Sequence, residues 1–120
     1  MTESPFGPDA LDPDCKQMES RSRFVPRHVV DELFALIDEN MAQSTQIKVP
    51  TLMIVGAEDH VVDNLAAKTW LEDLQVPSRF ETLDGCAHMI QRDYKWREVA
   101  AITGQWIRSL PQDGESSDSL

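Results

Sequence analysis

The sequence feature that most constrains the fold is an uninterrupted apolar run, Leu52-Met53-Ile54-Val55, which follows Thr51 and ends at Gly56. A short apolar run of this kind, bounded by a turn residue, is typical of a strand that is covered on both faces of a parallel sheet. An alternating strand on a half-solvated sheet would carry polar residues at every second position. We therefore interpret residues 51–55 as a buried strand.

Helical patterns and a second strand surround this run. Apolar residues recur at steps of three and four in residues 26–41, 64–74 and 94–110, which predicts three helices. Polar and apolar residues alternate in residues 79–83, which suits a strand nearer the edge of the same sheet. Strands that are joined through a helix are expected to be parallel and right-handed, so the order of elements predicts an α/β fold.

Two strands are few for such a sheet. An apolar strand at the edge of a two-stranded sheet leaves a row of backbone groups without partners. The pattern therefore predicts a piece cut from a larger sheet, in residues 23–110. We expect the isolated chain to be marginally stable and to cover this edge by self-association, by its own N-terminal part or by aggregation.

Composition and charge exclude several classes of protein. The net charge is −10 over 120 residues, but the first 20 residues contribute −4 and the last ten −3. No basic patch for nucleic acid or anionic lipid is present, and no apolar run is long enough to span a membrane. Residues 1–22 and 111–120 are expected to be irregular or disordered acidic segments. Because residues 1–20 do not resemble a signal peptide, a cytoplasmic location is expected, with Cys15 and Cys86 as free thiols.

The loops that follow the two strands carry the candidate catalytic groups. The first strand leads into Gly56-Ala57-Glu58-Asp59-His60, and the second into Asp84-Gly85-Cys86-Ala87-His88. Functional groups of open α/β sheets gather at the carboxyl ends of the strands. Asp59 and His88 are therefore expected to lie on neighbouring loops, within about 3 to 4 Å of each other or joined by one water. A carboxylate in this position orients an imidazole that acts as a general base.

Both motifs resemble those of the α/β-hydrolase family. The segment KVPTLMIVGAEDHVVDN is similar to the family's acid-bearing strand and loop, and ETLDGCAHMIQRD to its last strand with a G-x-x-H loop. The family's chain order of nucleophile, acid and histidine is also kept. The resemblance covers residues 24–110, and it implies that Asp59 is the acid and His88 the base of a catalytic triad. It further implies that residues 26–41 form a cap or lid helix, and lysophospholipase-like and monoacylglycerol-lipase-like serine hydrolases are the most similar members.

The family's nucleophile is missing from the sequence. It belongs to a G-x-S-x-G motif on a sharp turn between a strand and a helix, and no two glycines of this chain are four positions apart. A Gly-rich loop of the kind that forms the family's oxyanion hole is missing too. Ser44, Ser78 and Ser109 lie outside such a context, and we interpret them as ordinary loop or helix-end residues.

Simpler interpretations stand beside these assignments. Asp59 taken alone is more often a turn former than a catalytic acid, and Asp63 is expected only to cap a helix. Cys86 lies on the same loop as His88, but nothing nearby would lower the pKa of its thiol. Asp59, His60 and His88 together form a conceivable metal site, although the two loop motifs already explain Asp59 and His88 without one.

Two functions from different classes follow. The first is the C-terminal part of a serine hydrolase that cleaves a carboxylic ester of lysophospholipid or monoacylglycerol type, without a cofactor and inactive on its own. Its partner is then a small ester or lipid substrate in the full-length form. The second is a non-catalytic fragment that binds a partner or a second copy through its sheet edge.

Overall fold

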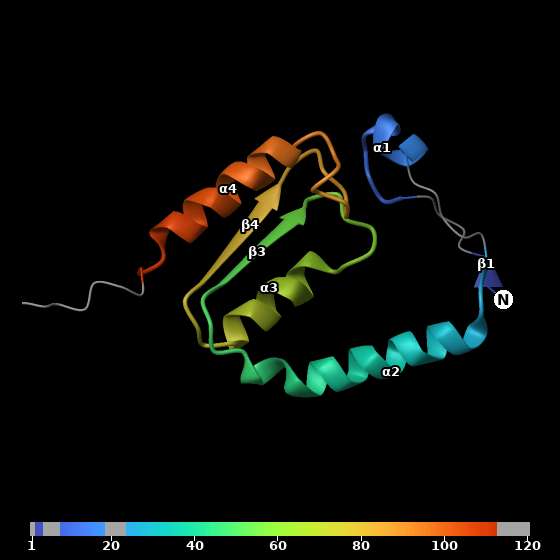
Figure 1. The fold of residues 1–120 in the computed structure, drawn as a ribbon, viewed down its shortest axis with the longest axis horizontal. Coiled ribbons are helices and arrows are strands. Elements are labelled where there is room, and N and C mark those ends of the chain that lie inside the picture. The colour runs from blue at the N-terminus through green and yellow to red at the C-terminus, as the bar shows by residue number, and fades with distance from the viewer. Residues whose placement is uncertain (1, 4–7, 19–23, 113–120) are drawn as a thin grey trace, which may run out of the picture.

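The computed structural model describes residues 2–3, 8–18 and 24–112. Helices and strands alternate along most of this length, as Figure 1 shows. Their order and bounds are β1 (Thr2–Glu3), α1 (Pro13–Met18), β2 (Phe24–Val25), α2 (Arg27–Gln43), the 3₁₀ turn η1 (Ser44–Gln46), β3 (Thr51–Gly56), α3 (Asn64–Asp73), β4 (Ser78–Leu83) and α4 (Trp96–Ser109).

The parallel strands β3 and β4 form the centre of the fold, as the sequence predicts. They pair in register from Thr51 opposite Ser78 to Gly56 opposite Leu83. Pro77 contributes its carbonyl to this register, because the Thr51 N–H donates to it at 2.9 Å. Among the described residues, β3 pairs with β4 alone, so its other edge carries no strand.

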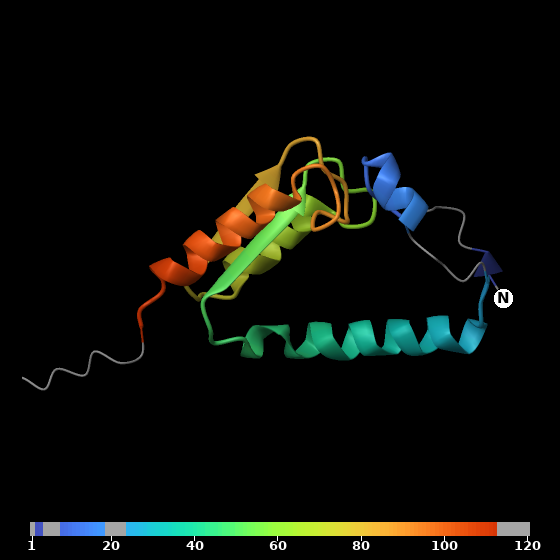
Figure 2. The same cartoon turned by 45° about the horizontal axis from the view of Figure 1, so that its top comes forward.

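Helices α3 and α4 cover opposite faces of this sheet, which Figure 2 shows from the side. Helix α3 begins where predicted, because the Asp63 side chain accepts hydrogen bonds from the N–H groups of Leu65 and Ala66 and so caps it. The connection between the strands runs through α3, which is the α/β pattern.

One cluster of the core lies between the sheet and α4. Its buried members are Leu83, Cys86 and Ile90, and half-buried Ile54, Val99 and Ile102 pack against them. The sequence predicted a fully buried first strand, but residues 51–54 of β3 are only half-buried. One helix covers each face of the sheet, but no described strand borders the edge of β3 that faces away from β4. Residues 51–54 therefore stay partly exposed along this edge.

The N-terminal part is more ordered than predicted. Residues 1–22 were expected to be irregular, yet Pro13–Met18 form helix α1 and Thr2–Glu3 pair antiparallel with β2. Helix α1 lies beside the carboxyl ends of β3 and β4 (Figures 1 and 2). The predicted irregular residues 4–7 and 19–22, and all but two residues of the predicted acidic tail 111–120, lie outside the described residues.

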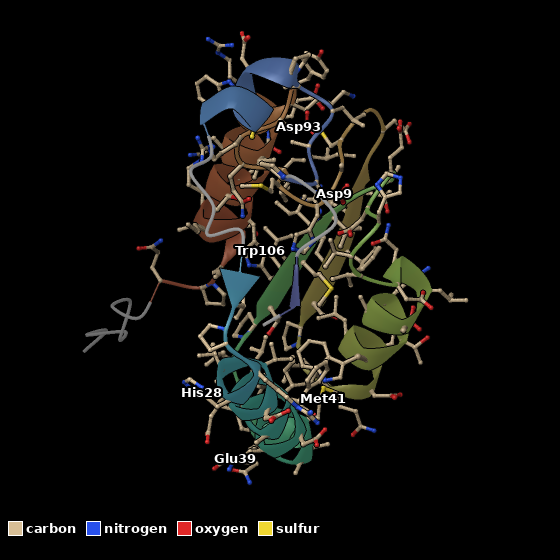
Figure 3. The ribbon with its side chains drawn as sticks, turned by 90° about the vertical axis from the view of Figure 1, so that its right-hand side faces the viewer. Asp9, His28, Glu39, Met41, Asp93 and Trp106 are labelled. Atoms are coloured by element: carbon tan, nitrogen blue, oxygen red, sulfur yellow. The ribbon has the colours of Figure 1, made fainter. Side chains whose placement is uncertain are left out.

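Helix α2 runs along one side of the molecule and contributes nothing to the core. None of its residues is buried. Figure 3 shows its labelled residues His28, Glu39 and Met41 at the opposite end of the molecule from Asp9 and Asp93. Large apolar side chains of α2 are exposed instead, namely Val29, Leu33, Phe34, Leu36, Ile37 and Met41.

None of the helices in the described part of the chain combines the length and the apolar character that crossing a membrane requires.

Candidate functional site

Backbone pairing continues from the two strands into the loops that follow them. The Ala57 N–H donates to the Leu83 carbonyl at 2.9 Å, and the Glu58 N–H donates to the Cys86 carbonyl at 3.0 Å. Gly56 permits this close approach, because a Cβ atom at that position would collide with the carbonyl oxygens of Cys86 and Ala87. The two loops are therefore held side by side by their own backbones.

The Asp59 side chain is almost completely buried at this junction, with an exposed fraction of 4%. Its Oδ1 accepts hydrogen bonds from the N–H groups of Val61 and Val62, both at 2.8 Å. Burial alone would raise the pKa of Asp59, but the hydrogen bonds from Val62, His88 and Val61 outweigh burial and lower it overall. The carboxylate is therefore ionised at neutral pH and acts only as an acceptor.

His88 contacts the remaining oxygen of this carboxylate. Its Nδ1 lies 2.9 Å from Asp59 Oδ2, so the expected contact between the two side chains is confirmed. Since an ionised carboxylate only accepts, Nδ1 carries a proton and donates a hydrogen bond to Asp59. The ring is 42% exposed, and its Nε2 lies on the side away from the carboxylate. In the neutral tautomer with its proton on Nδ1, the ring carries its lone pair on Nε2.

His60, the other histidine of these loops, contacts a different carboxylate. Its Nδ1 lies 2.7 Å from Asp9 Oδ1, and its backbone N–H donates to Asp9 Oδ2 at 2.9 Å. The conceivable metal site of Asp59, His60 and His88 thus has its histidines on separate carboxylates. No group of three or more His, Cys, Asp or Glu side chains within the described ranges is arranged to hold a metal ion.

The surroundings of Cys86 and of the three serines agree with the interpretation that none of them is a nucleophile. Both cysteines are free and buried, and burial raises the pKa of the Cys86 thiol, which disfavours a thiolate nucleophile. The hydroxyls of Ser44 and Ser109 donate to carbonyls of their own helix ends. Ser78 begins β4 at the end of the sheet opposite to Asp59 and His88.

Two site residues, Asp9 and Asp93, were missed by sequence reasoning. The Asp93 side chain is fully buried and accepts from four backbone N–H groups, those of Leu11, Asp12, Ala87 and Tyr94. Asp9 contacts residues 51 and 79 positions away. An acidic residue shortly before the last predicted helix was a weak signal for Asp93, whereas the Pro- and Asp-rich context of Asp9 carried none.

A cavity of about 370 Å³ opens beside the pair. Asp59 and His88 border it together with mainly apolar neighbours, namely Met53, Ile54, Val55, Val62, Ala67, Met89, Ile90 and Gln91. Successive side chains of a strand point to opposite faces. Because three successive β3 residues border the cavity, it runs along the strand edge that β4 does not occupy.

The class of protein that this fold and site indicate is an α/β hydrolase. Members of this class carry an acid after one strand of a parallel sheet and a histidine after the next. Residues 13–95 match the family described as serine aminopeptidase, S33, and the chain belongs to this family of α/β hydrolases. The resemblance to the α/β-hydrolase family is thereby confirmed. No curated protein matches the chain.

Two solved structures resemble the chain. A predicted CIB-like hydrolase from Thermoplasma acidophilum is 26% identical with a TM-score of 0.54, over 62% of this chain and 35% of that one. A monoacylglycerol lipase from Paleococcus ferrophilus is 19% identical with a TM-score of 0.68, over 82% of this chain and 40% of that one. The lipase supports the fold alone, and the chain spans less than half the length of either protein.

Proposed function

We propose that this chain supplies the acid and the base of a serine hydrolase that cleaves carboxylic esters through an acyl-enzyme. The observation that carries the proposal is the 2.9 Å contact between His88 Nδ1 and Asp59 Oδ2. Asp59 fixes the tautomer and the orientation of the ring, and it stabilises the imidazolium that forms during the reaction. His88 Nε2 is the atom that exchanges protons with the reacting groups.

The reaction has two halves. In the first, His88 Nε2 takes the proton of a serine hydroxyl while the serine oxygen bonds to the acyl carbon. The leaving alcohol then receives that proton from Nε2. In the second, Nε2 takes a proton from water, the water oxygen bonds to the acyl carbon, and the serine oxygen leaves with the proton from Nε2, which frees the acid and restores the histidine. The serine belongs to a G-x-S-x-G motif that the sequence of this chain does not contain.

The shared fold supports a lipid-like acyl group in the substrate. The cavity beside His88 runs along the edge where a complete sheet would add a strand, so its apolar border does not indicate a substrate. The lipase from Paleococcus ferrophilus, whose name states its own substrate class, shares the fold over 82% of this chain. We therefore propose a lysophospholipid or a monoacylglycerol as the substrate class.

The experiment joins this chain to the N-terminal portion of an S33 serine hydrolase that contains its G-x-S-x-G serine. We expect the chimera to react with a fluorophosphonate probe and to hydrolyse p-nitrophenyl esters. Asp59→Ala and His88→Ala should each abolish both reactions, whereas Asp84→Ala, an exposed position on the loop before His88, should not. A folded chimera that keeps its activity in His88→Ala would contradict the proposal.

The second candidate function, a non-catalytic interaction fragment, is favoured by the strand edge of β3. Among the described residues this edge has no strand partner, and a cavity runs along it. Backbone N–H and C=O groups on such an edge bind an added strand. Concentration-dependent dimerisation in size-exclusion chromatography, together with an inactive chimera, would support this candidate over the hydrolase.

A further inference from the structure

One oxygen atom bridges the two loops that carry Asp59 and His88. Oδ2 of Asp9 accepts a hydrogen bond from the backbone N–H of His60 at 2.9 Å, and another from the backbone N–H of His88 at 3.1 Å. His60 directly follows Asp59 in the chain. The same atom therefore contacts both loops within one residue of the catalytic pair.

The other polar groups of Asp9 contact the same two loops. Its Oδ1 pairs with the His60 ring at 2.7 Å, and its backbone carbonyl accepts from the Met89 N–H at 2.9 Å. The Asp9 side chain is 20% exposed, so these contacts are partly shielded from water. Figure 3 shows Asp9 and Asp93 at the same end of the molecule.

Asp93 fixes the segment that carries Asp9. Its buried carboxylate accepts from the Leu11 N–H at 2.8 Å and from the Asp12 N–H at 2.9 Å, two and three positions after Asp9. It also accepts from the Ala87 N–H at 2.9 Å, directly before His88. The segment of residues 9–12 is therefore anchored to the histidine loop at two points.

This arrangement matters for the geometry of the pair. The contact between Asp59 and His88 joins two loops, and the His88 ring is nearly half exposed, so a shift of either loop would break it. Hydrogen bonds to an ionised carboxylate are shorter and stronger than neutral ones. Asp9 makes two of them to backbone groups, which cannot swing away as side chains do.

We propose that Asp9 is a positioning residue, whose carboxylate clamps the loop of Asp59 to the loop of His88 and so sets the geometry of their hydrogen bond. Asp9 does this without contacting the Asp59 side chain or the substrate. This inference rests on the proposed function, because the pair that Asp9 positions is the proposed acid and base.

The test observes the Nδ1 proton of His88 by NMR in the full chain. A ring proton that is hydrogen-bonded to a carboxylate exchanges slowly and resonates downfield, and its disappearance in His88→Gln assigns it. We expect Asp9→Ala to abolish or broaden this signal. Asp9→Asn keeps an oxygen that can accept from both backbone N–H groups, so it should restore most of the signal. Asp12→Ala is the matched control, because within the described part of the chain the Asp12 side chain accepts from its own segment, at the Asp14 N–H.

The outcomes separate the two proposals. An unchanged His88 signal in a folded Asp9→Ala variant, with Asp59→Asn abolishing it, would overturn the positioning role alone. A signal that does not respond to Asp59→Asn would overturn the pair itself and with it the proposed function. If circular dichroism shows that Asp9→Ala is unfolded, Asp9→Glu takes its place. Asp9→Glu keeps the negative charge, but its extra methylene displaces the carboxylate from the two backbone N–H groups. An unshifted signal of the His88 Nδ1 proton in that variant would again overturn the positioning role of Asp9.

Discussion

The carboxylate of Asp93 accepts a hydrogen bond from the backbone N–H of Ala87 at 2.9 Å, in a place where both residues are completely buried. The same carboxylate holds the backbone at Leu11, Asp12 and Tyr94. One side chain thus joins the N-terminal part of the chain, the histidine loop and the approach to α4.

Removing this carboxylate should therefore destabilise the whole fold. Asp93→Ala leaves four backbone N–H groups without their acceptor, and a buried donor without a partner costs about 1–3 kcal/mol. Because water can reach some of the four, we expect a total loss of about 3 kcal/mol in urea unfolding. The exposed Asp84→Ala should change the free energy of unfolding by less than about 0.5 kcal/mol. Equal effects of the two variants would contradict the role of Asp93.

Acid should destabilise the protein below about pH 4. Burial alone would raise the pKa values of Asp9, Asp59 and Asp93, but in each carboxyl the hydrogen bonds outweigh burial and lower the pKa below its usual value of 3.8. A lowered pKa in the folded state means that the unfolded chain binds protons first as the pH falls. The stabilisation is fully present above the unfolded pKa, and it is lost as the pH falls through the folded pKa.

Thermal melting at several pH values measures this dependence. The Tm should change little from these groups between about pH 7 and 5, and it should drop as the pH falls below about 4. Asp93→Asn removes one titrating group and keeps an acceptor oxygen. Its Tm should therefore be lower at pH 7 but decline less steeply in acid. A slope identical to that of the wild type would show that Asp93 does not contribute to the acid sensitivity.

The close approach at Gly56 should tolerate no side chain. A Cβ there would collide with the carbonyls of Cys86 and Ala87, so Gly56→Ala must push the two loops apart, at a cost of about 3 kcal/mol. Gly85 is the matched control: its φ of +72° is strained for alanine, but a Cβ there meets no atom within 4 Å. Gly85→Ala should cost about 1–2 kcal/mol. The His88 Nδ1 proton should be lost in Gly56→Ala and kept in Gly85→Ala.

Two apolar truncations should differ sharply. Leu71 of α3 is 2% exposed, so Leu71→Ala leaves a cavity and should cost about 3 kcal/mol. Phe34 of α2 is 60% exposed, so Phe34→Ala should change the free energy of unfolding by less than about 0.5 kcal/mol. Urea unfolding at low protein concentration compares them. A large loss in Phe34→Ala would mean that α2 is packed in solution, against the chain itself or against a second copy.

The chain as given should not hydrolyse esters. Without a G-x-S-x-G serine there is no activated oxygen to acylate, whatever the state of His88. Incubation with p-nitrophenyl esters should match a blank without protein, and a fluorophosphonate probe should not label the chain. Labelling that disappears in His88→Ala would identify one of the serines present as a nucleophile.

Local sequence patterns predicted the two strands that carry Asp59 and His88 in the loops after them. Parallel pairing of β3 with β4 follows from the α/β order, and it brings their carboxyl ends to one edge, where Asp59 and His88 meet. The last helix begins at Trp96 instead of Tyr94, because the Tyr94 N–H donates to the Asp93 side chain and the Trp96 N–H to the Asp93 carbonyl.

The N-terminal contacts were not predictable in the same way. Asp93 meets Leu11 across 82 positions, and Asp9 meets His88 across 79. These bonds join side-chain oxygens to backbone N–H groups, which every residue except proline has, so the sequence carries no periodic trace of them. The short helix α1 is likewise too brief to show an apolar stripe.

Among the described residues, the contacts that hold Asp59 against His88 lie between residues 9 and 94, from the Asp9 clamp to the Tyr94 N–H on Asp93. Gene recombination with a junction before Pro8 would therefore leave these described contacts intact. The acid and the base would be inherited as one preassembled unit, with their mutual geometry already set. A serine brought by any joined or separate polypeptide would have to be aligned with a single atom, Nε2 of His88, and not with two independent side chains.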